Sequence, residues 1–280
     1  MGIFPKLKIG DAISPPFFHG AFENLESLPK LEYPDGFESN EWVITALVHL
    51  YNLAQHGTVD HHLLPFFKMV ISRLRSVERL SILDFGGGVG DNYIQLKKVL
   101  PSDLFNKVQY TIIDKPGSID VVKSLHKDVR CFCNVEQAVT DGEKYDLALF
   151  SGVLMFVENS PELIKSIKKY FGCDIYITRT LFTDTVPTYT TVLYISPGDG
   201  PFLGKFIGVS FSTIWNSQLF FEQAEIPREH ILIFHGYEKY NAALQNLPPK
   251  YRDAKYYTIY ISNDESSHYN TAWYNSITKS

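Results

Sequence analysis

Short apolar segments alternate with amphipathic segments through the middle of the chain. Five apolar segments of strand length cover residues 81–85, 108–113, 129–132, 145–150 and 174–180. The clearest intervening helices are predicted at 92–100 and 161–170. Strands that alternate with helices are typical of a parallel sheet covered by helices. The pattern therefore predicts an α/β fold with a doubly wound sheet.

The region before these strands is predicted to contain an arm and two helices. The first 35 residues are rich in Pro, Phe and Gly, which is typical of an irregular segment lying on a surface. Apolar residues then recur at helical spacing from Ser39, a candidate N-cap, to Gly57, and again over 59–75. We expect residues 1–77 to form an N-terminal arm and helical extension, and residues 78–280 to form one domain.

After the fifth predicted strand the sequence becomes rich in Thr and Tyr. Residues 183–211 are expected to form a lid-like section, followed by a helix at 212–224. Two further apolar runs, 231–237 and 256–262, are expected to pair as antiparallel strands. These two runs bring the expected sheet to seven strands.

Charge and composition narrow the classes of function. Lys and Arg total 26 while Asp and Glu total 31, so the formal net charge is −5 and a strongly basic nucleic-acid binder is excluded. The longest apolar run, residues 147–157, is too short to span a membrane. Cys131, Cys133 and Cys173 are odd in number and lack C-x-x-C spacing. We therefore expect no disulfide framework, no zinc site and a reducing, cytoplasmic setting.

The most informative segment is a glycine-rich turn between the first predicted strand and the next helix. It runs from Asp84 to Asp91 with the sequence DFGGGVGD. Glycine lacks a Cβ atom, so it adopts positive φ angles easily and lets the backbone approach a ligand closely. The helix that follows presents free N–H groups at its N-terminus. The turn therefore predicts a site for a nucleotide-bearing ligand.

Asp91 bears on the type of nucleotide ligand. The dinucleotide-binding pattern G-x-G-x-x-G would start at Gly86 and Gly88 and would require Gly or Ala at position 91. An aspartate there places a negative charge where a pyrophosphate would lie. A sulfonium cofactor has no phosphate and is positive around its reactive centre. The charge thus favours a sulfonium cofactor over a dinucleotide.

Written from Asp84, the turn reads D-x-G-x-G-x-G and resembles motif I of the class I S-adenosylmethionine-dependent methyltransferases. The resemblance implies a Rossmann-like, seven-stranded methyltransferase sheet and S-adenosyl-L-methionine as cofactor. It also implies that Gly86 and Gly88, in a turn completed by Gly90, pass beneath the methionine and ribose of the cofactor. Asp84 would orient the turn or the cofactor's amino group. A tight turn that serves only packing is the alternative.

Residues at the ends of the next three strands are further candidates for cofactor binding. Asp114 follows the second strand and can accept two hydrogen bonds from ribose hydroxyls, or can serve the turn before Pro116. Asn134 follows the third strand and could accept from the adenine amino group, or could be an ordinary turn residue. Ser151 and Gly152 follow the fourth strand, where the resemblance implies that the backbone holds the methionine moiety.

Several segments between about residues 18 and 237 resemble a family of methyltransferases associated with surface-polysaccharide biosynthesis. The matching segments are Asp84 to Gly87, Tyr93, Asp114 to Pro116, Ser151 to Leu154 and Thr178 to Thr180. This narrower resemblance implies a sugar or a lipid-linked glycan as the methyl acceptor.

Methyl transfer needs few catalytic residues, because holding donor and acceptor in line supplies most of the rate. A hydroxyl acceptor benefits from a general base, for which His235 is the first candidate and His19 the second, unless each is structural. Arg179 could clamp a phosphate or carboxylate of the acceptor, or form a surface salt bridge. His61 and His62 lack a third ligand, so no metal is expected.

The sequence thus predicts an O-methyltransferase that acts on a hydroxyl of a sugar, a glycan precursor or another small molecule. We expect no nucleic-acid partner and no membrane span. Aromatic residues of the section after the fifth strand are expected either to wall the acceptor or to belong to the core; they include Tyr194, Phe202, Phe206 and Phe211. Two alternatives stay open: a nicotinamide-dependent oxidoreductase, and a non-catalytic adenosyl-binding protein.

Overall fold

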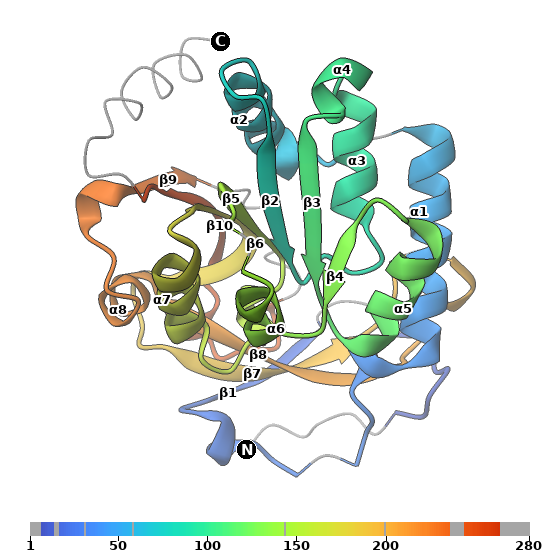
Figure 1. Ribbon diagram of the computed structural model, residues 1–280. Helices are drawn as coiled ribbons and strands as arrows, with labels where there is room; N and C mark the ends of the chain where they lie inside the picture. Colours follow the sequence, from blue (N-terminus) through green and yellow to red (C-terminus); the bar gives the residue numbers. More distant parts are fainter. Residues whose placement is uncertain are drawn as a thin grey trace.

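A mostly parallel sheet with helices on both faces organises the chain (Figure 1). The structure is a computed structural model and describes residues 7–13, 17–30, 32–57, 59–142, 144–198, 200–235 and 244–263. Within these residues, no helix combines the length and the apolar character needed to cross a bilayer.

Seven of the ten strands in the described residues form the main sheet, in the order β4-β3-β2-β5-β6-β10-β9. They are β2 (Leu80–Phe85), β3 (Val108–Ile113), β4 (Arg130–Phe132), β5 (Leu147–Ser151), β6 (Asp174–Thr183), β9 (Ile231–His235) and β10 (Lys255–Ile261). The first five run parallel, and β10 is antiparallel to both β6 and β9. This confirms the predicted fold class, a doubly wound, Rossmann-like α/β sheet of seven strands.

Alternating side chains of the central strands enter two hydrophobic cores, one on each face of the sheet. On β2, Ile82 packs into the first core and Leu83 into the second. The first face is covered by α2 (Leu64–Leu74), α3 (Asp91–Val99) and α5 (Pro116–Leu125). The second is covered by α6 (Val135–Thr140), α7 (Ser160–Phe171) and α8 (Ser217–Gln223). The short α4 (Ser102–Phe105) follows α3. Burial of both faces explains why these strands read as short apolar runs.

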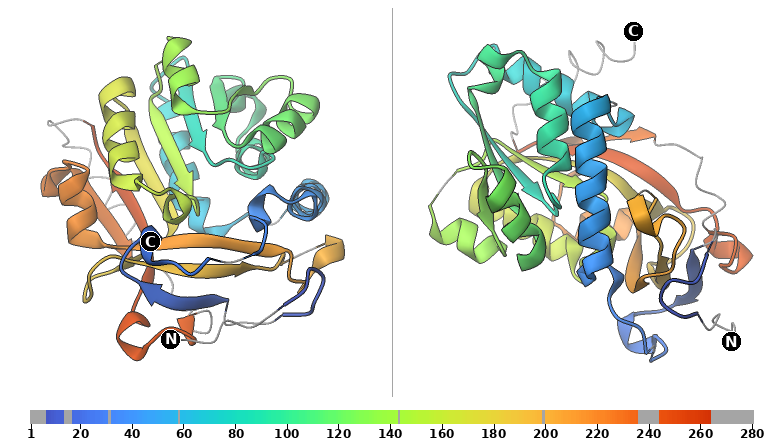
Figure 2. Two further views of the ribbon diagram at one scale, coloured as in Figure 1. Left: turned by 90° about the horizontal axis from the view of Figure 1, so that it is seen from below. Right: turned by 90° about the vertical axis from the view of Figure 1, so that its right-hand side faces the viewer.

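The long N-terminal helix α1 (Asn40–His56) packs outside α3, on the side away from the sheet (Figure 2). Ser39 caps it by accepting a hydrogen bond from the backbone N–H of Trp42, and Gly57 ends it with a φ of +69°. Lys98 of α3 donates to the backbone oxygen of Leu53, which ties the two helices together. The predicted helical extension therefore lies beside the glycine turn that begins α3.

A second, antiparallel sheet combines the N-terminal arm with the section after β6 (Figure 2). Its strands are β1 (Phe18–Phe22), β7 (Tyr189–Ile195) and β8 (Gly208–Asn216). The end of β8 pairs in parallel with Phe182 and Thr183 of β6, which joins the two sheets. The predicted lid-like section at 183–211 thus supplies β7 and the first part of β8.

The structure corrects one predicted helix and confirms one predicted strand pair. The helix expected at 212–224 is wrong over its first half, because residues 212–214 pair with β7 and β8 ends only at Asn216. Asn216 then caps α8 by accepting from the backbone N–H of Leu219. The antiparallel pair expected from 231–237 and 256–262 is confirmed by β9 and β10, of which β9 is described as far as His235.

Candidate functional site

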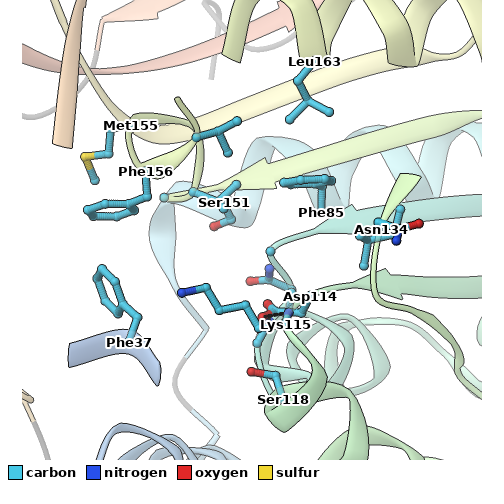
Figure 3. Close-up of a pocket in the computed structure, with 18 of the residues that line it drawn as sticks. Phe37, Phe85, Asp114, Lys115, Ser118, Asn134, Ser151, Met155, Phe156 and Leu163 are labelled. Atoms are coloured by element: carbon cyan, nitrogen blue, oxygen red, sulfur yellow. Dashed lines mark hydrogen bonds between the residues drawn. The ribbon is translucent and has the colours of Figure 1, made fainter. Parts of the chain in front are cut away.

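A cavity of about 1510 Å³ lies at the carboxyl ends of the parallel strands, where the chain order reverses between β2 and β5. Ligands of open α/β sheets bind at such reversal points. Residues predicted from the sequence that line the cavity are Gly86, Gly88, Asp114, Asn134, Ser151, Gly152 and Arg179. Asp84 and Gly90 are not among the lining residues. Figure 3 shows several of the lining side chains converging from strand ends, α5 and the segment before α1.

The glycine turn is closely packed on one side and open on the other. Gly86 has a φ of +71°, and a Cβ atom there would overlap Val153. Gly90 has a φ of +100°, and its Cβ would lie 2.9 Å from the His126 ring. Gly88 has a φ of +58°, yet a Cβ there would meet no described heavy atom within 4 Å. The backbone at Gly88 is therefore the part of the turn that a ligand can approach.

Asp84 lies fully buried beneath the turn and holds it from below. Its Oδ2 accepts a hydrogen bond from the Tyr110 hydroxyl at 2.8 Å, and both of its oxygens accept from Asn92 Nδ2, at 3.1 and 3.3 Å. A Cβ on Gly87 would lie 2.7 Å from Asp84 Oδ2. Burial raises the pKa of Asp84 to about 7, although both donors act in the opposite direction. Of the two roles predicted for Asp84, this geometry supports orienting the turn.

Asp114 connects the turn to the end of β3. Its Oδ2 accepts from the backbone N–H of Gly88 at 2.7 Å, and its Oδ1 accepts from that of Lys115 at 2.7 Å. An ionised carboxylate has about four acceptor sites, so two remain for hydroxyl donors. Lys115 Nζ pairs with Asp35 at 3.1 Å and Glu38 at 3.0 Å, which ties the segment before α1 to this edge of the cavity.

Asn134 lines the cavity where β4 ends and also caps α6. Its Oδ1 accepts from the backbone N–H of Gln137 at 2.9 Å. The oxygen expected to meet the adenine amino group is therefore already engaged in the helix cap. The alternative prediction, a turn residue, describes its present contacts.

Arg179 reaches the cavity through a bulge in β6. Tyr257 of β10 pairs with Thr180 and Ile259 pairs with Ile177, so two residues of β6 lie opposite Thr258 alone. The second of them, Arg179, has a φ of +55°, which is uncommon for a residue other than glycine. Bulges bend a strand and redirect a side chain, and they are frequent beside functional sites.

The Arg179 side chain bridges two parts of the cavity wall. Its Nε and Nη2 atoms donate to Ser151 Oγ at 3.2 and 2.9 Å, and its Nη1 lies 3.4 Å from Asp60 Oδ2. The adjacent Gly152 has a φ of +72° and donates its N–H to the Thr178 carbonyl at 2.9 Å. The guanidinium predicted to clamp an acceptor is thus engaged by groups of the protein itself.

Asp91 is the first residue of α3 and contributes a carboxylate to the cavity wall. Its Oδ1 is buried and has no hydrogen-bond partner among the described residues. Burial raises the pKa of Asp91 to about 6, while the charges of His49 and Arg179 act in the opposite direction. The sequence marked Asp91 as unfavourable for a pyrophosphate, but it did not show that one carboxylate oxygen is buried without a hydrogen bond.

Residues from the N-terminal extension complete the cavity, and sequence reasoning did not assign them to it. Phe37 packs edge-on against Trp42 and against Phe156, with ring centroids 4.8 Å apart in each pair, and all three line the cavity. Figure 3 shows Phe37 and Phe156 facing each other. Asp60, His61 and His62 line the cavity beside Arg179. The aromatic enrichment of the arm was the available signal, but the position of the arm depends on tertiary packing.

The aromatic wall expected from the section after β6 is not found there. Tyr194 and Phe206 are buried in a small core that includes Tyr33, below the second sheet. Neither they nor Phe202 and Phe211 are among the residues that line the cavity. Tyr194 lies in β7, whereas Phe202 and Phe206 lie in the segment between β7 and β8.

The two histidines predicted as general bases occupy different surroundings. His19 lies in β1, its ring centroid is 4.5 Å from that of Tyr194, and it is not among the cavity-lining residues. His235 ends β9 opposite Tyr257, and its side chain lies outside the described part of the structure. Its role as a base therefore stays a prediction.

Comparison with known proteins gives similarities of fold only. No family model matches the sequence, and no curated protein matches it. A solved S-adenosylmethionine-dependent methyltransferase from Clostridium acetobutylicum is 12% identical with a TM-score of 0.46, and the match covers 78% of this chain and 98% of that one. DesVI from Streptomyces venezuelae is 12% identical with a TM-score of 0.45, covering 80% and 99%. The [4+2]-cyclase SpnF is 13% identical with a TM-score of 0.45, covering 84% and 99%. Similarity this low assigns no activity or ligand to the chain.

Replacement of Asp84 should change how the stability of the protein depends on pH. The pKa of Asp84 is raised from 3.8 to about 7, so its stabilising contribution is complete below pH 3.8 and is lost as the pH rises through 7. The free energy of unfolding should therefore fall for the wild type relative to Asp84→Asn between pH 5 and pH 8, by at most about 3 kcal/mol. Urea unfolding at both pH values measures this difference. The exposed control Asp103→Asn should differ from the wild type by the same free energy at both pH values. If the difference between the wild type and Asp84→Asn were equally independent of pH, burial would not raise the pKa of Asp84.

Proposed function

We propose that the protein binds S-adenosyl-L-methionine in this cavity and catalyses methyl transfer to a hydroxyl group of a small molecule. The observation that carries the proposal is the buried, unpartnered carboxylate oxygen of Asp91 beside the open glycine turn. A buried carboxylate oxygen that lacks a hydrogen bond is costly, and a cationic ligand group that donates to it would remove that cost.

The cavity residues match the chemical parts of this cofactor. The open backbone at Gly88 allows the ligand to approach, and the spare acceptor sites of Asp114 suit two ribose hydroxyls. The Asp91 carboxylate suits the α-ammonium group of the methionine part. When bound, the sulfonium cofactor supplies an electrophilic methyl group. Ser151 and Gly152 bound the same region and help to exclude water from it.

The same carboxylate argues against the nicotinamide alternative. Two like charges 4 Å apart repel by about 4 kcal/mol at the effective dielectric constant typical of a protein surface. A pyrophosphate next to Asp91 would meet that repulsion, whereas S-adenosylmethionine carries two positive groups and one negative group. The position of Asp91 at the start of α3 therefore supports the sulfonium cofactor.

The size and lining of the cavity support a second, smaller ligand beside the cofactor. Ligand pockets usually measure about 300–1000 Å³, and this cavity is larger, at about 1510 Å³. Phe37, Trp42 and Phe156 offer aromatic faces, while Asp60 and His62 offer polar groups. Sugar rings stack on aromatic faces and hydrogen-bond to such polar groups. This lining suits an acceptor that is partly apolar and rich in hydroxyls.

The nature of the acceptor and the cellular setting come from the sequence. Resemblance to methyltransferases of surface-polysaccharide biosynthesis makes a sugar or a glycan precursor the first acceptor to test. The three cysteines are free thiols, which suits a reducing, cytoplasmic setting. His235 remains the proposed base for the hydroxyl proton.

The cofactor assignment predicts that S-adenosylhomocysteine binds and that its affinity depends on Asp91. Since a hydrogen bond to a charged group contributes about 1.5–3 kcal/mol, Asp91→Asn should weaken binding roughly tenfold or more at pH 7.5. Affinity for the wild type should fall from pH 7.5 to pH 5.5, because protonation of Asp91, whose pKa is raised to about 6, removes the charge. Isothermal titration calorimetry measures both effects.

A ligand without the amino-acid part provides the control. Methylthioadenosine should bind the wild type and Asp91→Asn with equal affinity. Its affinity should change with pH to the same extent for both proteins. His49 and Arg179 also face Asp91, and the comparison with Asp91→Asn separates its carboxylate from their charges. Absence of S-adenosylhomocysteine binding to the wild type, or tighter binding of NAD, would overturn the proposed cofactor.

Replacement of Gly88 should block the ligand without preventing folding. Gly88 and Gly142 both have positive φ angles, +58° and +75°, and neither would bring a Cβ within 4 Å of a described atom. Valine at either position should therefore cost about 1–2 kcal/mol of stability or somewhat more. Only Gly88 lines the cavity, so Gly88→Val should abolish S-adenosylhomocysteine binding while Gly142→Val retains it. Equal affinities of the two folded variants would show that the turn is not the binding surface.

Turnover distinguishes an enzyme from a non-catalytic adenosyl-binding protein. Labelled methyl transfer is measured with a panel of nucleotide sugars, glycans and phenols. Transfer to a hydroxyl of a sugar is the expected result. Binding of the cofactor without transfer to any member of the panel would favour the binding protein.

A further inference from the structure

Three consecutive side chains at the start of the second helical segment form a cluster to which the proposed function assigns no catalytic or cofactor-binding role. They are Asp60, His61 and His62, which precede or begin the short 3-10 helix η3 (His61–Leu63). One carboxylate oxygen and one ring nitrogen from each histidine lie within 4.8 Å of one another, and all three residues line the cavity. The sequence suggested that His61 and His62 lack a third ligand, and the structure supplies Asp60.

The backbone of this cluster is fixed by contacts on both sides. Asp60 accepts from the backbone N–H of His62 at 3.0 Å, and its own N–H donates to Gln95 Oε1 at 2.6 Å. The carbonyl of His62 accepts from the Tyr176 hydroxyl at 3.1 Å. These bonds connect η3 to α3 and to β6. The cluster therefore stands on a rigid support, which a metal site requires for defined geometry.

We propose that Asp60, His61 and His62 bind a divalent transition-metal ion in the cavity. Two imidazole nitrogens and one carboxylate oxygen form a mixed donor set that suits zinc and its neighbours rather than magnesium or calcium. Three protein ligands leave at least one position open, as in catalytic metal sites. The open position lies in the cavity, where an oxygen atom of a second ligand can occupy it.

The present spacing needs a small adjustment to surround an ion. Metal–ligand bonds of about 2.0–2.2 Å place the ligand atoms of a tetrahedral site about 3.3 Å apart. His61 Nδ1 lies 3.9 Å from Asp60 Oδ1, and the two imidazole centroids are also 3.9 Å apart. The ligand atoms lie within 4.8 Å of one another, so binding an ion requires side-chain rotations that shorten the longest separation by up to about 1.5 Å and turn the two rings apart. The His61 side chain is half-exposed, so it has room to rotate.

Arg179 is the cation that Asp60 contacts when no metal is bound. Its Nη1 lies 3.4 Å from Asp60 Oδ2, while its other nitrogens donate to Ser151. The Ser151 contacts can retain the guanidinium when a metal ion takes the carboxylate. Asp91 also lines the cavity and lies close enough to Arg179 for their charges to interact. Within the cluster itself, the carboxylate of Asp60 supplies the negative charge that attracts a divalent cation.

Zinc titration of the full-length protein tests the site without any knowledge of the acceptor. The wild type should bind one Zn²⁺ per chain at micromolar or lower concentration. Asp60→Asn, His61→Gln and His62→Gln should each weaken binding about tenfold or more. Asn caps a helix as well as Asp, so Asp60→Asn preserves the η3 cap and removes a charged ligand. Thermal unfolding checks that each variant folds.

Two comparisons identify the ligands. His56→Gln, at the exposed end of α1, should bind Zn²⁺ like the wild type. Co²⁺ bound to the wild type should show visible absorption bands that are lost in His61→Gln and His62→Gln. Arg179→Asn should bind Zn²⁺ several-fold more tightly, because the competing cation is gone and asparagine tolerates the positive φ of that position.

Equal Zn²⁺ affinities in the wild type and the three ligand variants would overturn the proposed site, and so would weaker binding by Arg179→Asn. S-adenosylhomocysteine titrations of the same proteins give a separate readout. The metal site does not depend on the proposed cofactor, so either proposal can fail while the other stands.

Discussion

The cavity depends on one buried carboxylate, that of Asp84. Because it is removed from water, its oxygens require donors, and Tyr110 from β3 and Asn92 from α3 supply them. These contacts hold two strands and a helix around one point. The glycine turn passes directly above, so close to the carboxylate that position 87 has no room for a side chain. Asp84, which lies on the buried side of the glycine turn, thus fixes the shape of the surface that the turn presents to the cavity.

The glycines at positions 86, 88 and 90 serve two opposite purposes. Gly86 and Gly90 are required because Val153 and His126 occupy the space of any side chain, whereas Gly88 leaves its space empty. Asp114 holds the backbone at Gly88 by accepting its N–H, so the open position is also rigid. A ligand therefore meets a preformed surface and does not have to order it, which reduces the entropy lost on binding.

The main sheet and the turn were predictable because their signals are local. Buried parallel strands read as short apolar runs, and the D-x-G-x-G-x-G segment needs no distant residue to be recognised. The other half of the site was not predictable in this way. Phe37 and Asp60 reach the cavity only because α1 packs against α3, and Arg179 does so only because β6 bulges opposite Thr258. The length of β8 was not predictable because residues 212–215 are all buried, so the alternation that marks a half-exposed strand is absent there.

Arg179 makes the two halves of the cavity depend on each other. Its guanidinium donates to Ser151 at the end of β5 and pairs with Asp60 before η3, so it lies between the glycine-turn side and the N-terminal side. A bulge with a positive φ is costly for arginine, and such strain persists only where the surrounding structure enforces it. Here the enforcing contacts are the pairing of β6 with β10 and the two hydrogen bonds to Ser151. A ligand that binds Asp60 in place of Arg179 therefore leaves the guanidinium bonded to Ser151. A ligand that replaces the contact with Ser151 leaves the guanidinium paired with Asp60. Occupancy of one half of the cavity thus changes the contacts of Arg179 and, through its charge, the electrostatic field in the other half.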